Sequence, residues 1–169
     1  MRHQQILYRK AVETDCPEMV AVHYAAVRAI ASTHYPAEVL AAWSPEPDDA
    51  RHTWLAGVVA QDAVLCTVAT RPDGSIVGFC IASPGESLLR AIYVHPDFAG
   101  NGIGRGLLEQ AQTACRALGV ASLWLNASYN AEAFYLGCGY EVVGPVTHPL
   151  SDEALMGATR MVKHIGVTR

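Results

Sequence analysis

Two spacings of apolar residues divide the chain into predicted strands and helices. Short apolar runs rich in β-branched and aromatic residues are typical of strands, and they occur at residues 6–9, 63–69, 76–82, 88–94, 123–125, 140–143 and 155–162. Apolar residues that recur every three or four positions are typical of helices, and they occur at residues 15–30, 34–43, 48–59, 107–118 and 131–136. In the third helix we expect Trp54, Leu55, Val58 and Val59 to face inward.

Two pairs of these strands are predicted to be antiparallel. The turn Arg71-Pro72-Asp73-Gly74 separates residues 63–69 from 76–82, and in such a turn proline presets φ while glycine allows a positive φ. Residues 140–143 and 155–162 are predicted to close the sheet as a second pair. A loop at 144–153, which contains His148, would join them.

The stretch 88–108, LLRAIYVHPDFAGNGIGRGLL, has the order strand, glycine-rich turn and helix. Its apolar run, with Ile92, Tyr93 and Val94, favours a strand buried on both faces. The first N–H groups of a helix lack partners and attract anions, and glycines let a phosphate approach them. Four alternating glycines, at 100, 102, 104 and 106, exceed what a tight turn needs. We therefore predict a phosphate-binding loop, with a tight turn alone as the alternative.

Two nucleotide-binding motifs are excluded by their spacing. A Walker A loop ends in Gly-Lys-Ser/Thr, which the glycine-rich turn lacks. The dinucleotide motif G-x-G-x-x-G, started at Gly100, needs a third glycine where the chain has Arg105. Started at Gly102, the same motif meets Leu107 instead. The predicted phosphate therefore belongs to another class of ligand.

The composition limits the classes of function. With 169 residues, 51% of them hydrophobic, the chain is expected to form one domain, residues 1–169, with a full-sized core. A net charge of −4 and the lack of a basic run argue against nucleic-acid binding. No apolar run approaches the roughly 18 residues that span a bilayer, so we do not expect a membrane protein.

The spacing of cysteine and histidine bears on the compartment and on metal binding. The five cysteines are scattered without C-x-x-C spacing, which is typical of reduced, buried thiols in the cytoplasm. The seven histidines show no ligand spacing with cysteine or carboxylate. We therefore expect a cytoplasmic protein without a metal site.

The glycine-rich stretch resembles the GNAT superfamily of acyl-CoA-dependent N-acetyltransferases. Tyr93-Val94-His95-Pro96 and Gly102-Ile103-Gly104 match its first signature. Phe134-Tyr135-Leu136-Gly137-Cys138-Gly139-Tyr140, preceded by Asn130, is similar to its second signature. Ala99 departs from the pattern, since the family usually has Gln or Arg at that position.

The resemblance implies an α/β (α+β) fold with a mixed, mostly antiparallel central sheet flanked by helices. Two strands of that sheet would splay apart at a bulge to hold acetyl-CoA, the implied cosubstrate. The pantetheine arm would lie along strand 88–94, and the pyrophosphate would lie on the amides of the glycine loop. The cofactor-binding residues implied in this way are Ile92, Tyr93, Val94, Ala99, Gly100, Asn101, Gly102, Ile103, Gly104, Arg105 and Asn130. For Asn130, capping of the helix at 131–136 is the alternative.

The resemblance also implies the catalytic groups. Tyr135 matches the tyrosine that protonates the departing thiolate, and the alternative is a core tyrosine. Phe134 beside it is the natural core residue of the pair. Leu88 occupies the position where many members carry a glutamate, and leucine cannot take a proton. The general base is therefore unassigned.

The acceptor site is expected beside the helical segment that follows residue 31, because that segment walls the acceptor site in the family. The candidates are His34, Tyr35, Trp43, Glu86 and His148, three of which (His34, Glu86 and His148) could relay the amine proton. For the two aromatic residues, Tyr35 and Trp43, the alternative is that they are packing residues with polar tips. The acceptor could be a small polyamine, an amino acid, an antibiotic or a protein N-terminus, and a homodimer is possible.

Two functions from different classes are open at this point. The leading hypothesis is an N-acetyltransferase that moves an acetyl group from acetyl-CoA to a primary amine by direct attack in a ternary complex. The alternative is a non-catalytic acyl-CoA-binding sensor or partner-binding module, which Leu88 and Ala99 favour. Tyr135 argues against the sensor, because a sensor needs no acid for a leaving group.

Overall fold

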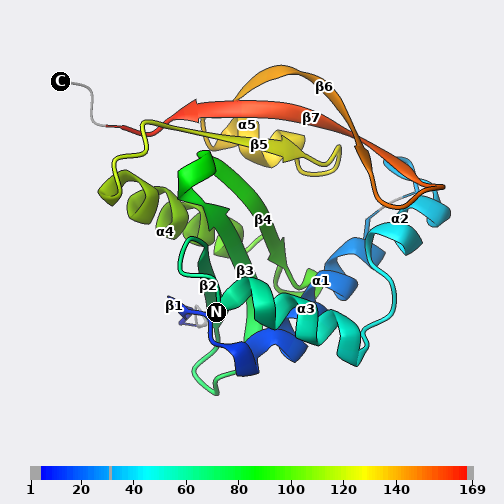
Figure 1. Cartoon of the computed structure of the whole chain (residues 1–169), viewed down its shortest axis with the longest axis horizontal. Coiled ribbons are helices and arrows are strands. Elements are labelled where there is room, and N and C mark those ends of the chain that lie inside the picture. Colours follow the sequence, from blue (N-terminus) through cyan, green and yellow to red (C-terminus); the bar gives the residue numbers. More distant parts are fainter. Residues whose placement is uncertain (1–4, 31, 167–169) are drawn as a thin grey trace.

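A seven-stranded sheet runs through the computed structural model, which describes residues 5–30 and 32–166 (Figure 1). The strands are β1 (Leu7–Lys10), β2 (Leu65–Thr70), β3 (Ile76–Ser83), β4 (Leu88–Val94), β5 (Ser122–Ala127), β6 (Glu141–Pro149) and β7 (Leu155–His164). Their order across the sheet is β1-β2-β3-β4-β5-β7-β6. Neighbouring strands are antiparallel except β4 and β5, which are parallel. The predicted fold class is confirmed.

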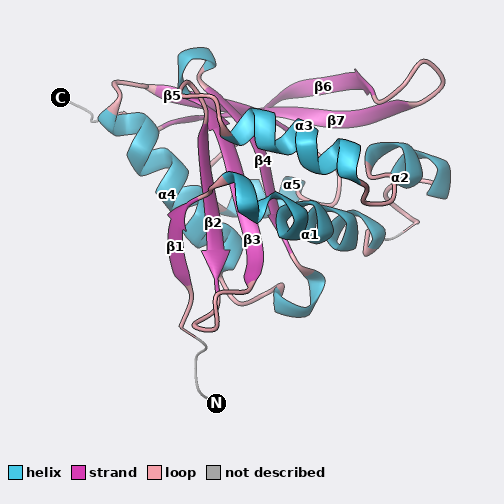
Figure 2. Cartoon of the chain, turned by 60° about the horizontal axis from the view of Figure 1, so that its bottom comes forward, coloured by secondary structure: helices cyan, strands magenta, loops and turns pink. Residues whose placement is uncertain are grey.

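Helices cover both faces of the sheet (Figure 2). They are α1 (Cys16–Arg28), α2 (Ala37–Trp43), α3 (Asp49–Val59), α4 (Ile103–Ala117) and α5 (Glu132–Gly137). The helices α1 and α3 bury one core against β2 and β3, which includes Met19, Leu55 and Phe79. A second core, on the opposite face, includes Leu107 of α4 and Tyr135 of α5. None of the helices in the described ranges has the length and hydropathy that crossing a membrane requires.

The turn between β2 and β3 forms as its sequence predicts. The Gly74 N–H donates to the carbonyl of Arg71 at 2.9 Å, and Gly74 has a φ of +88°. The two strands pair antiparallel from Leu65 opposite Ala82 to Thr70 opposite Ile76, with one register shift. The predicted hairpin is therefore confirmed.

Helix α4 and strand β6 extend furthest beyond their predicted limits. Helix α4 begins at Ile103, so Gly104 and Gly106 lie inside its first turn and not before it. Strand β6 continues to Pro149 and pairs with β7 along its length. The loop predicted at 144–153 is therefore wrong, and His148 lies on a strand opposite Met156. A long two-stranded antiparallel ribbon can twist away from the core while its hydrogen-bond ladder continues.

The predicted orientation of α3 is wrong at one residue. Leu55, Val58 and Val59 are buried as expected, but Trp54 is 66% exposed. A rotation of 100° per residue puts Trp54 at the margin of the face that those three residues share.

The strands β4 and β5 diverge after a single residue pair, Leu88 opposite Trp124. Beyond that pair, β4 borders open space on its β5 side. The prediction that this strand is buried on both faces is therefore wrong, and Leu89 is its only fully buried residue.

A bulge in β4 lies at the point of divergence. Ile81 pairs with Ala91 and Ala82 pairs with Leu89, so Arg90 is an extra residue on β4. A bulge bends its strand and changes the direction of side chains, and bulges are common beside active sites. The bulge and splay that the family resemblance implied are both present, and Arg90 lies at their centre.

Candidate functional site

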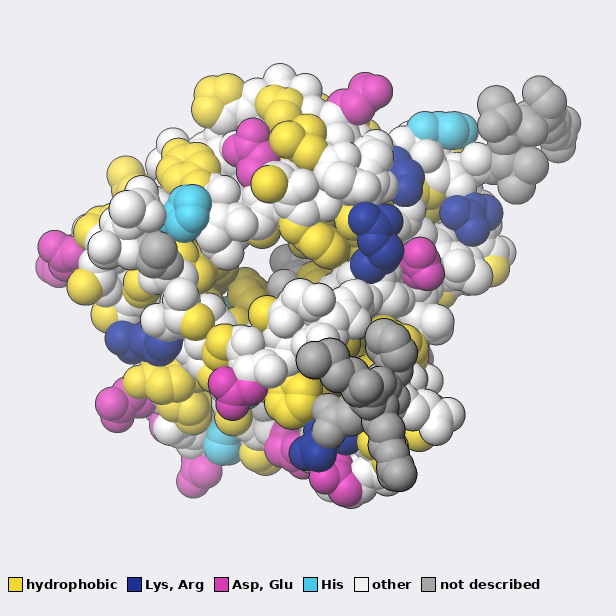
Figure 3. All heavy atoms as spheres, turned by 180° about the vertical axis from the view of Figure 1, so that it is seen from behind, with side chains coloured by type: hydrophobic (Ala, Val, Ile, Leu, Met, Phe, Trp, Pro, Cys, Tyr) yellow, Lys and Arg dark blue, Asp and Glu magenta, His cyan; other side chains and the backbone are white. Residues whose placement is uncertain are grey.

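A cavity of about 400 Å³, called the splay cavity here, lies between β4 and β5. In the space-filling view the middle of the molecule is hollowed, and hydrophobic side chains gather around the hollow (Figure 3). Leu88 and Ile92 line one wall, and Trp124 and Tyr135 line the other. Because β3 pairs with only one edge of β4, the backbone groups on the other edge have no strand partner past Leu88. An extended polar ligand could pair with that edge like an added strand.

A second cavity, of about 390 Å³ and called the entry cavity here, adjoins the first on the side of the glycine loop. Trp43, Ile92 and Tyr93 line both cavities. The entry cavity also joins segments that are distant in the sequence. Five of the predicted cofactor-binding residues line it together, namely Ile92, Tyr93, Val94, Ala99 and Asn130.

The glycine loop leads into the N-terminus of α4. Gly100 and Gly102 have φ angles of +77° and +78°, where other residues are strained. The Gly106 N–H donates to the Gly102 carbonyl at 3.0 Å, which is the first hydrogen bond of the helix. The N–H groups of residues 103–105 therefore precede the helical ladder, at the positive end of the α4 dipole. This geometry suits a phosphate.

Three of the four glycines have a structural reason apart from any ligand. A Cβ on Gly106 would overlap the hydroxyl of Tyr8 on β1, and the two preceding glycines with positive φ are needed for the turn. Gly104 has neither reason, since a Cβ there would meet the Phe134 ring at 3.4 Å and Val94 at 3.8 Å, which is ordinary contact. The number of glycines therefore does not by itself indicate a phosphate site, and only Gly104 lacks a structural reason.

The side chains of the loop hold its shape. Asn101 Nδ2 donates to two carbonyls of the preceding turn at 3.0 and 3.3 Å. Ile103 is 3% exposed and belongs to the core, so only its backbone can meet a ligand. Arg105 donates to the Gly137 carbonyl at the end of α5, at 3.3 Å. A ligand bound by this loop would therefore contact its backbone N–H groups.

Tyr135 lines the splay cavity from α5. Its ring packs edge to face against Phe134 and Tyr140, with centroids 5.0 and 5.6 Å away. Burial raises the pKa of Tyr135 well above its usual value, so its hydroxyl carries its proton at neutral pH. Phe134 is less buried than Tyr135, and the prediction that Phe134 is the core residue of the pair is wrong. Tyr135 both packs and faces the cavity.

Asn130 does not cap α5. The N-cap is Ala131, which has no side-chain hydrogen bond, and Asn130 is exposed. The side chain of Asn130 forms no hydrogen bond with the residues that the structure describes. The capping interpretation of Asn130 is therefore wrong, and Asn130 instead lines the entry cavity.

Tyr35 is a packing residue. It is 3% exposed, and its hydroxyl donates to the Gly157 carbonyl at 2.6 Å and accepts from the Tyr129 N–H at 2.9 Å. Its ring stacks on that of Tyr129, with centroids 5.1 Å apart. These contacts fasten the segment before α2 to β7 and to the loop after β5. They match the packing alternative, and Tyr35 is not retained as an acceptor-site residue.

The other four acceptor-site candidates are separated by the structure. His34 lines the entry cavity and His148 lines the splay cavity, so the two histidines lie on different walls. Trp43 lines both cavities. Glu86 is exposed on the short turn before β4, outside the lining of either cavity, and its carbonyl accepts from Trp124 Nε1 at 3.0 Å.

A third cavity, of about 620 Å³ and called the helical cavity here, lies between α1, α3 and the strands β3 and β4. It shares Trp43, Arg90 and Tyr93 with the splay cavity. Most of its walls are apolar, and they include Val20, Trp54, Leu55, Val58, Phe79 and Ile81. Its polar side chains are His23, Asp48, Arg51 and Arg90.

Burial, followed by the charge of Arg51, lowers the pKa of His23 to about 4. The ring is therefore neutral at pH 7. Its Nδ1 lies 2.8 Å from Ser44 Oγ and 3.4 Å from Arg51 Nη2. Since the arginine can only donate, Nδ1 is an acceptor and the proton of the neutral ring is on Nε2.

The titratable side chains of the helical cavity were not predicted from the sequence. A lone arginine inside the apolar run 88–94 was an available signal for Arg90. No comparable signal existed for His23 or Arg51, because α1 and α3 have ordinary amphipathic patterns and only packing brings these side chains to β4.

The family model described as acetyltransferase (GNAT) domain matches residues 58–142, just over half of the chain. An uncharacterized N-acetyltransferase of Methanocaldococcus jannaschii is 25% identical over 165 residues, which cover 93% of this chain and 66% of that protein. The chain thus spans slightly less than two thirds of the length of that curated relative.

Solved structures share the whole fold. A GCN5-related N-acetyltransferase of Rhodopseudomonas palustris superposes with a TM-score of 0.83 and 25% identity, covering 97% of this chain and 98% of that one. PaiA N-acetyltransferase of Thermoplasma acidophilum, solved with coenzyme A, has a TM-score of 0.77 and 19% identity over 95% and 99% of the two chains. YncA of Salmonella typhimurium, solved with acetyl-CoA, has a TM-score of 0.68 and 19% identity over 98% and 96%. With its splayed strands, glycine loop and match over residues 58–142, the chain belongs to the GNAT acetyltransferase family.

Proposed function

We propose that this protein transfers the acetyl group of acetyl-CoA to a primary amine by direct attack in a ternary complex. One observation carries the proposal: Tyr135, the unpaired edge of β4 and Trp124 line a single cavity, and a second cavity extends it to Ala99, next to the glycine loop. A proton donor and the unpaired backbone groups of β4 thus share one cavity, and the adjoining cavity reaches the start of the glycine loop. Two structures with the same fold contain coenzyme A or acetyl-CoA.

The residues present fit acetyl-CoA. The N–H groups of residues 103–105 would hold its pyrophosphate, and the lack of a side chain at Gly104 would let the phosphate approach them. Backbone groups of Ile92 and Val94 would pair with the pantetheine arm, whose amides match a strand edge. Asn130 and Ala99 would border the arm in the entry cavity.

The proposed reaction forms one bond and breaks another. The amine nitrogen forms a bond to the acetyl carbon, and the carbon–sulfur bond breaks. Tyr135 gives its hydroxyl proton to the departing sulfur, and a backbone N–H near Val94 faces the carbonyl oxygen while charge develops on it. The proton lost by the amine leaves to water and later restores Tyr135.

The general base is not assigned to a side chain in this proposal. Leu88 lines the splay cavity at the position of the usual glutamate, and Glu86 is exposed outside that cavity. An amine that arrives neutral needs no base. His148 lies on the cavity wall and could relay a proton through water.

The experiment that tests the proposed function is release of free thiol from acetyl-CoA, measured with and without a panel of amines. Amine-dependent thiol release, with the acetylated amine identified by mass spectrometry, is the expected result. Binding of acetyl-CoA without turnover of any amine would favour the sensor instead.

The free, buried state of all five cysteines, each within the described ranges, suits a reducing compartment such as the cytoplasm.

A further inference from the structure

We propose that the helical cavity binds the acceptor, and that the acceptor is an apolar amino acid or a similar small amine with a carboxylate. The inference rests on the proposed function, since it names the substrate class of the same site. It is carried by two guanidinium groups, those of Arg51 and Arg90, that line an otherwise largely apolar cavity beside the catalytic one.

Arg51 has hydrogen-bonding capacity that the protein leaves unused. Its Nε is buried and has no hydrogen-bond partner, and its Nη2 reaches only the ring of His23, at 3.4 Å. Across residues 5–30 and 32–166, no carboxylate lies within 4.0 Å of this guanidinium. A buried, unpaired donor destabilises a protein unless a ligand supplies the acceptor. A carboxylate is the group whose two oxygens match a guanidinium best.

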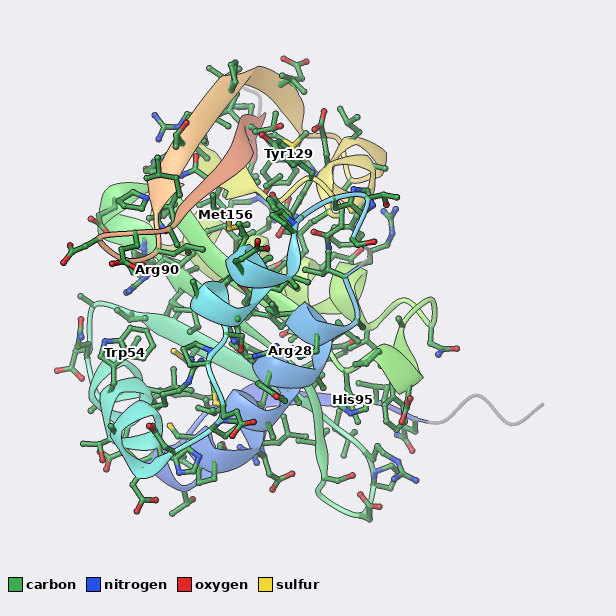
Figure 4. The ribbon with its side chains drawn as sticks, turned by 90° about the vertical axis from the view of Figure 1, so that its right-hand side faces the viewer. Arg28, Trp54, Arg90, His95, Tyr129 and Met156 are labelled. Atoms are coloured by element: carbon green, nitrogen blue, oxygen red, sulfur yellow. The ribbon has the colours of Figure 1, made fainter. Side chains whose placement is uncertain are left out.

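Arg90 places a second cation at the border of the two cavities. It is the extra residue of the β4 bulge, and it lines both the helical and the splay cavity. In the part of the chain that the structure describes, it forms no ion pair either. In Figure 4, Arg90 and Trp54 lie on the same side of the molecule, with Arg90 nearer to Met156 of β7.

An amino acid fits this arrangement because of its short backbone. Its amine and its carboxylate are attached to the same carbon. A carboxylate that accepts from both Arg90 and Arg51 therefore keeps the amine near the border, beside the cavity that Tyr135 lines. The side chain would extend into the helical cavity, whose walls include Leu55, Val58 and Phe79.

The same charges argue against a polyamine. Asp48 is the only acidic side chain among the lining residues, and its Oδ1 already accepts from the Arg51 N–H at 2.8 Å as the cap of α3. Two arginines would repel a second ammonium group. A polycation therefore finds no site in the helical cavity.

Matched acceptors test the carboxylate directly. We would compare leucine with leucinamide, isoamylamine and spermidine, and then repeat the comparison with methionine and phenylalanine. Leucine should exceed each of the other three by at least tenfold in kcat/KM. Arg90→Gln and Arg51→Gln should each lower the value for leucine at least tenfold and change that for leucinamide less than threefold. Lys10→Gln removes a cation from the exposed surface of β1 and is the control, with no expected change.

A binding measurement separates this inference from the proposed function. Trp43 and Trp54 line the helical cavity, so their fluorescence should change when N-acetyl-leucine binds, and its amide should bind at least tenfold more weakly. If acetyl-CoA is not used with any amine, the proposed function fails, whereas selective binding of N-acetyl-leucine would still support the carboxylate site. Equal binding of acid and amide, or a preference for leucine that survives both arginine variants, would overturn the inference. Arg90 is exposed, so its variant decides the question even if Arg51→Gln does not fold.

Discussion

At the scale of single residues, Tyr135 combines packing with chemistry. Its ring belongs to the core on the α4 face of the sheet, and its side chain also lines the splay cavity. Burial has two effects here, because it fixes the ring and raises the pKa of the hydroxyl. A tyrosine with a raised pKa is protonated at any pH near neutrality, so the proton that a general acid gives is present. Its neighbour Tyr140 shares the core position but not the cavity.

Replacing Tyr135 by phenylalanine should separate these roles. The ring stays, so the fold and the affinity for acetyl-CoA should be unchanged, while kcat should fall by about 10² to 10⁴ if the hydroxyl is the general acid. Steady-state kinetics with an active acceptor and calorimetric titration of acetyl-CoA measure the two effects. A wild-type kcat would leave Tyr135 with its packing role alone.

Tyr140→Phe is the matched control and a prediction in itself. The Tyr140 hydroxyl is buried without a hydrogen-bond partner in the described structure, and an unpaired buried hydroxyl costs free energy. Its removal should keep kcat and leave the free energy of unfolding equal or higher by about 1 kcal/mol. Urea denaturation measures the change. A clear loss of stability would mean that the hydroxyl has a partner, such as an ordered water.

His23 should make the stability depend on pH in a defined window. Its pKa is about 4 in the folded protein because of burial and, secondarily, Arg51, and about 6.5 in an unfolded chain. Between these values the unfolded chain binds a proton that the folded protein does not. The free energy of unfolding should therefore fall as the pH is lowered from about 6.5 to 4, by an amount on the order of 2–3 kcal/mol.

Urea denaturation at several pH values, with wild type and His23→Gln, tests this dependence. The variant should lose most of the pH dependence in the window, because glutamine does not titrate. Replacement of the exposed His164 by glutamine is the control for loss of an imidazole. Parallel curves for wild type and His23→Gln would contradict the assignment.

At the scale of elements, the start of α4 places two different demands on its glycines. Positive φ requires glycine at 100 and 102, and contact with Tyr8 requires it at 106. The last of these fastens α4 to β1 at the far edge of the sheet. Gly104 is free of both demands and lies where the helix N–H groups would meet a phosphate.

Gly104→Ala and Gly106→Ala should therefore have opposite consequences. The first should leave the stability nearly unchanged and weaken acetyl-CoA binding tenfold or more, about 1.4 kcal/mol. The second should lower the free energy of unfolding by about 1–3 kcal/mol, because Tyr8 must move to make room. Calorimetric titration and urea denaturation of both variants measure the two effects. Unchanged affinity in Gly104→Ala would place the pyrophosphate elsewhere.

At the scale of the whole molecule, two halves of the sheet are joined at a narrow point. The pair Leu88 and Trp124 links β4 to β5, and the Trp124 indole adds a hydrogen bond to the Glu86 carbonyl. Beyond this pair the two halves have no strand pairing, and the splay cavity lies where such contacts would be made. A ligand that fills the cavity would add those contacts and stabilise the folded state.

Acetyl-CoA should therefore raise the melting temperature. At a ligand concentration of 100 times Kd, binding adds about 2.7 kcal/mol, and each kcal/mol corresponds to about 2–4 °C for a domain of this size. We expect a rise of about 5–10 °C in a thermal-shift assay. Adenosine 3′,5′-bisphosphate, which lacks the pantetheine arm, is the control and should give a smaller rise. Equal shifts with the two ligands would remove the splay cavity from the binding site.

The sequence by itself determined the elements, the hairpin turn at Gly74, the glycine loop and the position of Tyr135. These features follow from local physics, since apolar period, positive φ and motif spacing involve residues that are near one another in the chain. Only the tertiary structure decided which side chains meet around the cavities. Hydrogen bonds with Tyr129 and Gly157 hold Tyr35 in the core, and the packing of α3 places Arg51 in the cavity beside β4. Such contacts join residues far apart in the sequence, so the apolar period and the motif spacing of one segment do not specify them.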